Sequence, residues 1–260
     1  MSDDLRAQWA AVAEHYGTGW SHADGPDLGW LVEAAAPEPA DRAIDLGAGA
    51  GHAALALAPH VAEVVAIDPT PEMLEIAVRL AGERGITNVT STVATADALP
   101  FPDAAFDIAI SRFSIHHWPD PAHAFRELAR VMRPGGRVVL IDLVAPEDAR
   151  LDSFLNAVEV LRDPTHGRSL RPSDWRAALA EAGLEGDIAR SWRFRHDTGD
   201  WLARTAPAAW RADAVCRMLR EASPLVRDAF EVADDGSGFT VGAVVVTARR
   251  GRGPGGGAGL

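Results

Sequence analysis

A chain of 260 residues, 47% of them hydrophobic, is long enough to bury a sizeable core as one large α/β domain or as a domain with a small cap. Carboxylates outnumber lysine and arginine by 37 to 25, and the formal net charge is −12. Nucleic-acid binders normally present a basic face, so this balance disfavours a nucleic-acid partner and favours small molecules.

The single cysteine excludes an intramolecular disulfide and a cysteine-rich zinc site, and we expect no metal. The first ten residues, MSDDLRAQWA, lack the basic-then-apolar pattern of a signal peptide. No apolar run approaches the roughly 20 residues of a membrane-spanning helix. We therefore expect a cytoplasmic protein without membrane contact. The sequence leaves the oligomeric state open, with a homodimer as one option.

The first half of the chain alternates between two kinds of pattern. Apolar and β-branched runs predict five strands, separated by amphipathic patterns that predict helices. The predicted strands are 43–46, 61–68, 88–93, 106–110 and 137–143, and the helices between them are 52–58, 72–81 and 120–132. Such alternation predicts a doubly wound parallel sheet. Two further helices, 5–16 and 27–36, precede the first strand and are expected to form a lid over the mouth of the sheet.

The second half has a different pattern. It predicts helices at 147–161 and 173–183, with Ser173 as the cap of the latter, a sixth strand at 185–194, helices within 198–229 and a final antiparallel strand at 239–248. The glycine-rich tail, 249–260, is predicted to be disordered. We thus divide the chain into a lid (1–40), a binding core (41–146), a helical substrate cap with the remaining strands (147–248) and the tail.

A glycine-rich turn follows the first strand. It has the spacing D-x-G-x-G-x-G, from Asp45 through Gly47 and Gly49 to Gly51. Glycines allow a sharp turn and close approach of a ligand, and the N-terminus of the next helix offers free N–H groups. A dinucleotide fingerprint would place its third glycine at position 52, which is His52. An NAD-dependent oxidoreductase is therefore disfavoured, and a tight turn without a ligand is the plain alternative.

Two further carboxylates follow strands. Asp68 ends the second strand, 23 residues after Asp45, where this kind of fold uses an acid to hold ribose hydroxyls. The same stretch also predicts a helix start, with Thr70 as N-cap and Pro71 at the first helical position. Asp97 follows the third strand and is a second candidate to bind a ligand. The alternative is that Asp97 is an exposed acid in a loop.

Taken in order, these motifs resemble the class I S-adenosylmethionine (SAM) dependent methyltransferases of the methyltransferase 11 type, which contains the ubiquinone/menaquinone C-methyltransferases. The resemblance rests on the segments Asp45–Gly51, Asp97–Phe101 (DALPF), SRF with HHW after the fourth strand, and LARVMRPGGR. Downstream, RDPTH and PSDW are similar to a bacterial branch of small-molecule methyltransferases of unassigned substrate. The resemblance covers about residues 5–248. It implies a Rossmann-like α/β fold, a doubly wound and mostly parallel seven-stranded sheet whose last strand is antiparallel.

The resemblance also implies site residues. Those expected to hold SAM, and its product S-adenosylhomocysteine, are Asp45, Gly47, Ala48, Gly49, Gly51, Asp68, Pro69, Met73, Asp97, Ala98, Ser111 and Arg112. Those expected to reach the substrate are Tyr16, His22, His166, Arg168 and Trp175.

Catalysis is expected to rely on orientation and a dry site, with a base only if the attacking atom carries a proton. His116 is the candidate base; its alternative is a positioning or packing role. We expect a methyltransferase acting on a small molecule. The alternative is a SAM-binding homologue that does not methylate, either a rearrangement catalyst or a binding subunit. The sequence does not distinguish O-, N- and C-methylation.

Overall fold

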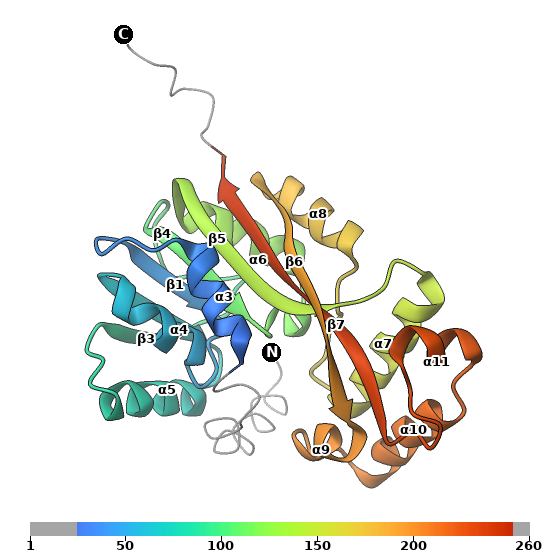
Figure 1. The fold of residues 1–260 in the computed structure, drawn as a ribbon. Coiled ribbons are helices and arrows are strands. Elements are labelled where there is room, and N and C mark those ends of the chain that lie inside the picture. Colours follow the sequence, from blue (N-terminus) through green and yellow to red (C-terminus); the bar gives the residue numbers. More distant parts are fainter. Residues whose placement is uncertain (1–24, 252–260) are drawn as a thin grey trace.

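The computed structural model describes residues 25–251, whose strands form one seven-stranded sheet in the order β3-β2-β1-β4-β5-β7-β6 (Figure 1). The strands are β1 (Arg42–Leu46), β2 (Glu63–Asp68), β3 (Val89–Val93), β4 (Phe106–Arg112), β5 (Met132–Val144), β6 (Leu184–Asp197) and β7 (Gly238–Arg250). The predicted helix at 5–16, with Tyr16 and His22, lies outside the described residues, as does 252–260.

Strands β1 to β5 pair in parallel, and β7 runs antiparallel to both of its neighbours, β5 and β6. The predicted sheet, with its antiparallel last strand, is confirmed. The chain passes from β1 outward to β3 and then returns to place β4 on the other side of β1. In open α/β sheets such a reversal opens a crevice at the carboxyl ends of the strands, where ligands bind.

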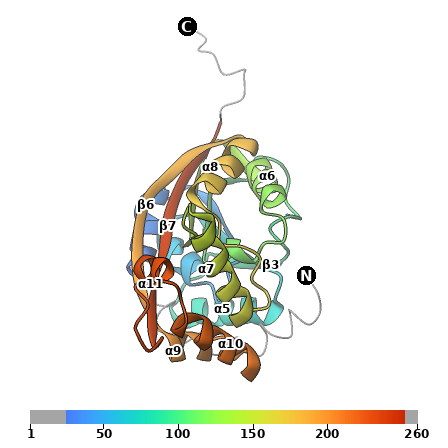
Figure 2. The same cartoon turned by 90° about the vertical axis from the view of Figure 1, so that its right-hand side faces the viewer.

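Helices cover both faces of the sheet because its central strands are apolar on both sides. On one face a buried cluster joins the sheet to α3 (Pro26–Ala35), α4 (His52–Leu57) and α5 (Pro71–Glu83). On the other, a cluster joins it to α6 (Pro121–Val131) and α8 (Pro172–Glu181), which lie together on one side of the sheet in Figure 2. Two short 3₁₀ turns, η1 (Ala58–His60) and η2 (Ile115–His117), complete this half.

The C-terminal helices form a separate layer beside the ends of β5, β6 and β7 (Figure 1). They are α7 (Ala149–Arg162), α9 (Thr198–Ala203), α10 (Ala209–Arg220) and α11 (Pro224–Phe230). Their apolar side chains pack against Phe239 and Val241 of β7. None of the helices within residues 25–251 combines the length and apolar character needed to span a bilayer.

Two local predictions differ from the structure. The sequence predicted a break over 133–136, but strand β5 already starts at Met132. Its pairing with β4 shifts register between Phe106 and Ile108, and this irregularity accommodates residues 133–136 within the strand. Helix α8 is capped by Arg171 rather than by Ser173, because Pro172 occupies its first turn. The Ser173 hydroxyl instead donates to Glu147. By contrast, Thr70 is the N-cap of α5 as predicted.

Candidate active site

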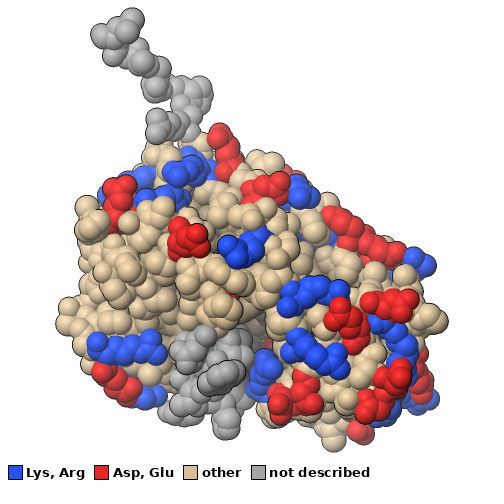
Figure 3. Space-filling view, viewed as in Figure 1, with Lys and Arg blue, Asp and Glu red and all other residues tan. Residues whose placement is uncertain are grey.

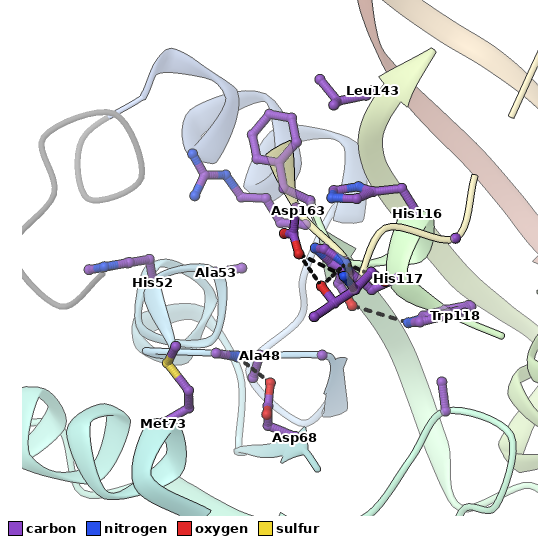
Figure 4. A pocket seen from close by; sticks show the side chains of 18 of the residues that line it. Ala48, His52, Ala53, Asp68, Met73, His116, His117, Trp118, Leu143 and Asp163 are labelled. Carbon is purple, nitrogen blue, oxygen red and sulfur yellow. Dashed lines mark hydrogen bonds between the residues drawn. The ribbon is translucent and has the colours of Figure 1, made fainter. Parts of the chain in front are cut away.

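A cavity of about 970 Å³ opens at the carboxyl ends of the parallel strands, between the sheet and the C-terminal helices. Of the residues predicted to hold the cofactor, nine line it: Asp45, Gly47, Ala48, Gly49, Asp68, Pro69, Met73, Asp97 and Arg112. Figure 4 shows Asp68 and Met73 on one side of the cavity and His116 and Asp163 on the other. The cavity thus has a glycine-rich half and a histidine-containing half.

The glycine turn shapes the first half through left-handed backbone. Gly47 has φ +66°, and a Cβ there would lie 1.8 Å from Ser114 Oγ, so the turn packs directly against η2. Gly49 has φ +52°, and no atom of residues 25–251 lies within 4 Å of the position its Cβ would take, so its bare backbone faces open space among the described residues. Gly51 does not line the cavity: a Cβ would meet Ala77 at 2.7 Å. We therefore reassign Gly51 to the close packing of this turn against α5.

Asp45 carries a buried carboxylate that is only half satisfied. Its Oδ2 accepts a hydrogen bond from Ala54 N at 3.0 Å, whereas Oδ1 has no partner among the described residues. Burial raises the pKa of Asp45 to about 7, against the opposing effect of the Ala54 bond. A buried acceptor without a partner is costly, so this oxygen is a natural place for a cationic or N–H donor from a ligand.

Asp68 links β2 to the glycine turn. Its Oδ2 accepts from Gly49 N at 2.9 Å and its Oδ1 from Thr70 N at 2.8 Å. Burial raises the pKa of Asp68, although both backbone bonds oppose the shift. A carboxylate has about four acceptor positions, so these two bonds leave room for a diol.

The next loop completes this half of the cavity. Asp97 lines it together with Ala94 and Ala96, whereas Ala98 is exposed and does not. The backbone N–H of Ala98 donates to Thr95 O, and this turn directs Ala98 outward. The prediction for Ala98 is therefore corrected.

The end of β4 also differs from the prediction. Ser111 is fully buried and its hydroxyl donates to Leu46 O at 2.8 Å, so it joins β4 to β1 and does not reach the cavity. Arg112 does line the cavity, where its guanidinium forms an ion pair with Asp27 of α3. Both side chains of this pair are more than nine-tenths buried. Arg112 thus fixes α3 against the cavity.

In the second half, His116 is held by a carboxylate that the sequence did not single out. Its Nδ1 lies 2.5 Å from Asp142 Oδ1, and its backbone N–H donates to Asp142 Oδ2 at 3.0 Å. Burial is the largest single influence and lowers the pKa of the imidazole, but the charge and hydrogen bond of Asp142, together with the charges of Glu159 and Asp163, raise the pKa of His116 overall. For Asp142, burial raises the pKa, but the charge and hydrogen bond of His116, with the backbone N–H groups of Leu143 and His116, lower it overall. The other ring nitrogen, Nε2, has no hydrogen-bond partner within residues 25–251.

Two more histidines surround His116, with ring centroids 4.1 Å (His117) and 5.5 Å (His166) away. His117 Nδ1 lies 2.9 Å from Thr165 Oγ1, and burial followed by the nearby His116 charge lowers the pKa of His117 to about 4. His166 Nε2 lies 3.0 Å from Asn156 Oδ1, and burial lowers its pKa to about 3. His166 packs next to His116 but does not line the cavity itself.

His166 is therefore withdrawn as a substrate residue, and two further residues predicted to touch substrate also lie outside the cavity. Arg168 is outside the cavity and its Nη2 pairs with Asp152 at 2.6 Å. Trp175 is 1% exposed and packs on Phe125 in the core beneath α6 and α8, because its helix turns the indole toward the sheet. Both substrate assignments are withdrawn.

Sequence reasoning missed several residues of the histidine-containing half. Asp142 follows the general rule for carboxyl ends of parallel strands and could have been found near the end of β5. Arg162 and Asp163 belong to the RDPTH segment, which carried the resemblance but received no role in the site. No local pattern marks the others, which come from β6, α9 and the C-cap of α9: Trp192, Phe194, His196, Trp201 and Arg204.

A glycine turn and strand-end carboxylates around one crevice of a 3-2-1-4-5-7-6 sheet define a class of cofactor-binding α/β enzymes, and comparisons with known proteins identify the family. Residues 44–140 match the family described as "Methyltransferase domain". The uncharacterised methyltransferase YcgJ of Bacillus subtilis is 40% identical over 218 residues, covering 84% of this chain and 86% of YcgJ. The chain therefore belongs to the class I methyltransferases.

Solved structures and a further sequence relative agree with this family assignment. The crystal structure of YcgJ superposes with a TM-score of 0.86 at 36% identity, covering 88% of this chain and all of that one. A demethylmenaquinone methyltransferase of Thermus thermophilus is 42% identical over 127 residues, 47% of this chain and 57% of its own. A geranyl diphosphate methyltransferase in complex with SAM shares the fold alone, with a TM-score of 0.62, 19% identity and coverage of 96% of this chain and 91% of that one.

Proposed function

We propose that this protein transfers a methyl group from SAM to a small organic acceptor. The observation that supports this most strongly is the convergence of Asp45, Asp68 and Asp97 with the bare backbone of Gly49 on one half of a single cavity. Methyltransferase chemistry itself follows from the family. What we propose beyond the family is that the methyl donor is SAM and that the acceptor is a small molecule.

The residues present fit SAM. The unpartnered Oδ1 of Asp45 suits the ammonium of the methionine portion, and Asp68 suits the ribose diol, since a carboxylate offers acceptors at a fixed separation. Asp97, beside two alanines, suits an adenine amine flanked by apolar surface. Any side chain at Gly49 would enter this space. The related geranyl diphosphate methyltransferase was solved with SAM bound, which supports the same choice here.

When bound, SAM supplies an electrophilic methyl group together with its own leaving group. The protein has to orient the acceptor, exclude water and accept any proton that the acceptor loses. His116 serves as the base: Asp142 holds Nδ1, so Nε2 is directed away from the carboxylate and can take a proton from an acceptor hydroxyl or amine.

The surface supports a small acceptor rather than a polyanion. In the view of Figure 3, acidic and basic side chains alternate over the C-terminal helices, so no continuous basic tract covers that part of the described surface. The acceptor named for the Thermus thermophilus relative, a demethylmenaquinone, is also a small organic molecule. Both observations favour an acceptor that enters the cavity.

Isothermal titration with SAM tests the cofactor. We expect binding by the wild type and a loss of about tenfold or more in affinity for Asp68→Asn, because a charged acceptor is replaced by a neutral one. Asp213→Asn, the same change at an exposed position of α10, should bind like the wild type. A folded protein that does not bind SAM would overturn the proposal.

Release of S-adenosylhomocysteine with a panel of small hydroxylated and amine acceptors tests the transfer. Tight SAM binding without product release from any acceptor would favour the non-methylating alternative.

A further inference from the structure

The end of the cavity nearest the C-terminal helices carries two arginines and a histidine around the indole of Trp201. Arg162 is the last residue of α7, His196 lies near the end of β6, and Arg204 caps the end of α9. All three line the cavity. We call Arg162, His196 and Arg204 the basic wall.

Arg162 is buried but keeps one donor available. Its guanidinium lies over the Trp201 ring, 4.8 Å from the centroid, and its side chain is 11% exposed. Nε donates to Trp201 O at 3.2 Å and Nη1 to Glu159 Oε2 at 3.1 Å. Nη2 has no hydrogen-bond partner within the described part of the chain. An arginine held in this way presents a fixed N–H group to the cavity.

His196 provides a second, neutral donor. Its ring stacks on Trp201 with 27° between the planes and 5.9 Å between centroids. Its Nδ1 lies 3.4 Å from Arg204 Nη2. Since an arginine nitrogen can only donate, Nδ1 accepts and the ring proton is assigned to Nε2. Burial, and then the charges of Arg204 and Arg162, lower the pKa of His196 to about 3, so the ring is neutral near pH 7.

The charge of the basic wall is opposite in sign to that of the whole chain. The chain carries −12, yet the charges of Arg204 and Arg162 act on His196. Glu159 and Asp163 balance part of the Arg162 charge. A modest positive field with N–H donors suits a monovalent carboxylate better than a doubly charged phosphate.

Aromatic rings line the cavity around the basic wall. Phe113, at the end of β4, has φ +51°, which is rare for a bulky residue and concentrates at functional sites. Its ring lies 6.5 Å from that of Phe194, which in turn stacks with Trp192 at 6.5 Å and 28°. Such surfaces bind flat, apolar molecules.

The basic wall and the proposed base border the same space. Asp163 follows Arg162 directly and accepts a hydrogen bond from the Thr165 hydroxyl, which lies 2.9 Å from His117 Nδ1. His117 is in turn adjacent to His116. Arg162 and His116 therefore line the same half of one cavity.

We propose that the basic wall binds the carboxylate of the methyl acceptor, and that the acceptor is an aromatic acid. Its ring lies against Phe113 and Phe194, and its attacking hydroxyl or amine faces His116. This inference rests on the proposed function, since it names the acceptor class of that same cavity.

The test is a binding comparison on the protein saturated with S-adenosylhomocysteine, so that no turnover occurs. The probes are 4-hydroxybenzoate, 4-hydroxycinnamate and 4-aminobenzoate, each paired with its methyl ester. We expect at least one acid to bind about tenfold or more tightly than its ester, as charged hydrogen bonds are lost in the ester. If no acid binds, or if acids and esters bind alike while SAM binding is intact, the inference is overturned and the proposed function stands. Failure of SAM binding would overturn the proposed function instead.

Double variants test whether the basic wall causes the preference for acids over esters. Arg162→Gln/Glu159→Gln removes the buried ion pair as a unit, and its matched control is Arg217→Gln/Glu221→Gln, an exposed pair on α10 with a 3.0 Å contact. The first should reduce the acid-over-ester preference to threefold or less at unchanged SAM affinity, and the control should keep it.

If the first double variant does not fold, His196→Phe replaces it. This change keeps an aromatic ring against Trp201 and removes the donor. A full acid preference in a folded variant of the basic wall would overturn the assignment.

Discussion

Replacing Asp45 with asparagine should stabilise the protein and weaken its ligand binding at the same time. The carboxyl has an ordinary pKa of 3.8 and a folded-state pKa of about 7, caused mainly by burial. Between these two values the folded state retains a proton that the unfolded state has lost. Stability therefore falls as the pH rises through this window. At about 1.36 kcal/mol per pH unit, the full loss is on the order of 4 kcal/mol.

Asparagine removes this penalty and keeps the useful contact. Its side-chain oxygen can still accept from Ala54 N, and its amide is uncharged at every pH. We expect Asp45→Asn to be more stable than the wild type, with a gain that is about 2–3 kcal/mol larger at pH 8 than at pH 5. SAM affinity should fall about tenfold or more, because the charged acceptor for the ammonium is lost.

Urea denaturation at the two pH values, together with calorimetric titration of SAM, checks both parts. Asp213→Asn is the matched control, since it makes the same change at an exposed site and should alter stability by less than about 0.5 kcal/mol at either pH. A gain that does not depend on pH, or a variant less stable than the wild type at pH 8, would refute the reasoning about burial.

Three other predictions follow from the same geometry. Gly49→Ala should cost only about 1–2 kcal/mol in urea denaturation, from its φ of +52°, yet reduce SAM affinity at least tenfold, because the added methyl enters open cavity; unchanged affinity would contradict this. Arg112→Met should destabilise the protein by about 3–5 kcal/mol, because Asp27 is left buried without its partner. The double variant Arg112→Met/Asp27→Leu should recover much of that loss. If the two substitutions instead destabilise the protein additively, the ion pair does not account for the loss. Asp142→Asn should lower the pKa of His116, since burial then acts without the compensating charge; the ascending limb of log kcat against pH should shift to lower pH, and a stationary limb would remove His116 as the base.

The glycine-rich half of the cavity, where we propose that SAM binds, was largely predictable in its position because its signals are local. The turn from Asp45 to Gly49 depends on residues a few positions apart, and its glycines are required by left-handed backbone. Asp68 was found from its place at a strand end. The three corrected predictions in this half concern orientation, since each residue lies at the predicted place in the chain. Gly51 packs against Ala77, Ala98 faces solvent, and the Ser111 hydroxyl donates to Leu46 O.

The histidine-containing half was not predictable in the same way. The sequence singled out His116 as a candidate base, but the carboxylate that holds it, Asp142, is 26 residues away and meets it only because β4 and β5 are adjacent and parallel. Trp175 was expected at the substrate, yet α8 packs its indole into the core. A helical pattern gives the face that is buried without saying against which element it is buried.

By itself, the sequence determined the order of strands and helices, the glycine turn and the carboxylates at the strand ends, because hydrophobic period and backbone preference act over a few neighbouring residues. Only the tertiary structure decided which distant side chains share the cavity. Arg162, His196 and Trp201 come from three elements and meet because β6 pairs with β7 and the C-terminal helices pack against their ends. Those contacts depend on long-range packing, which no short stretch of sequence encodes.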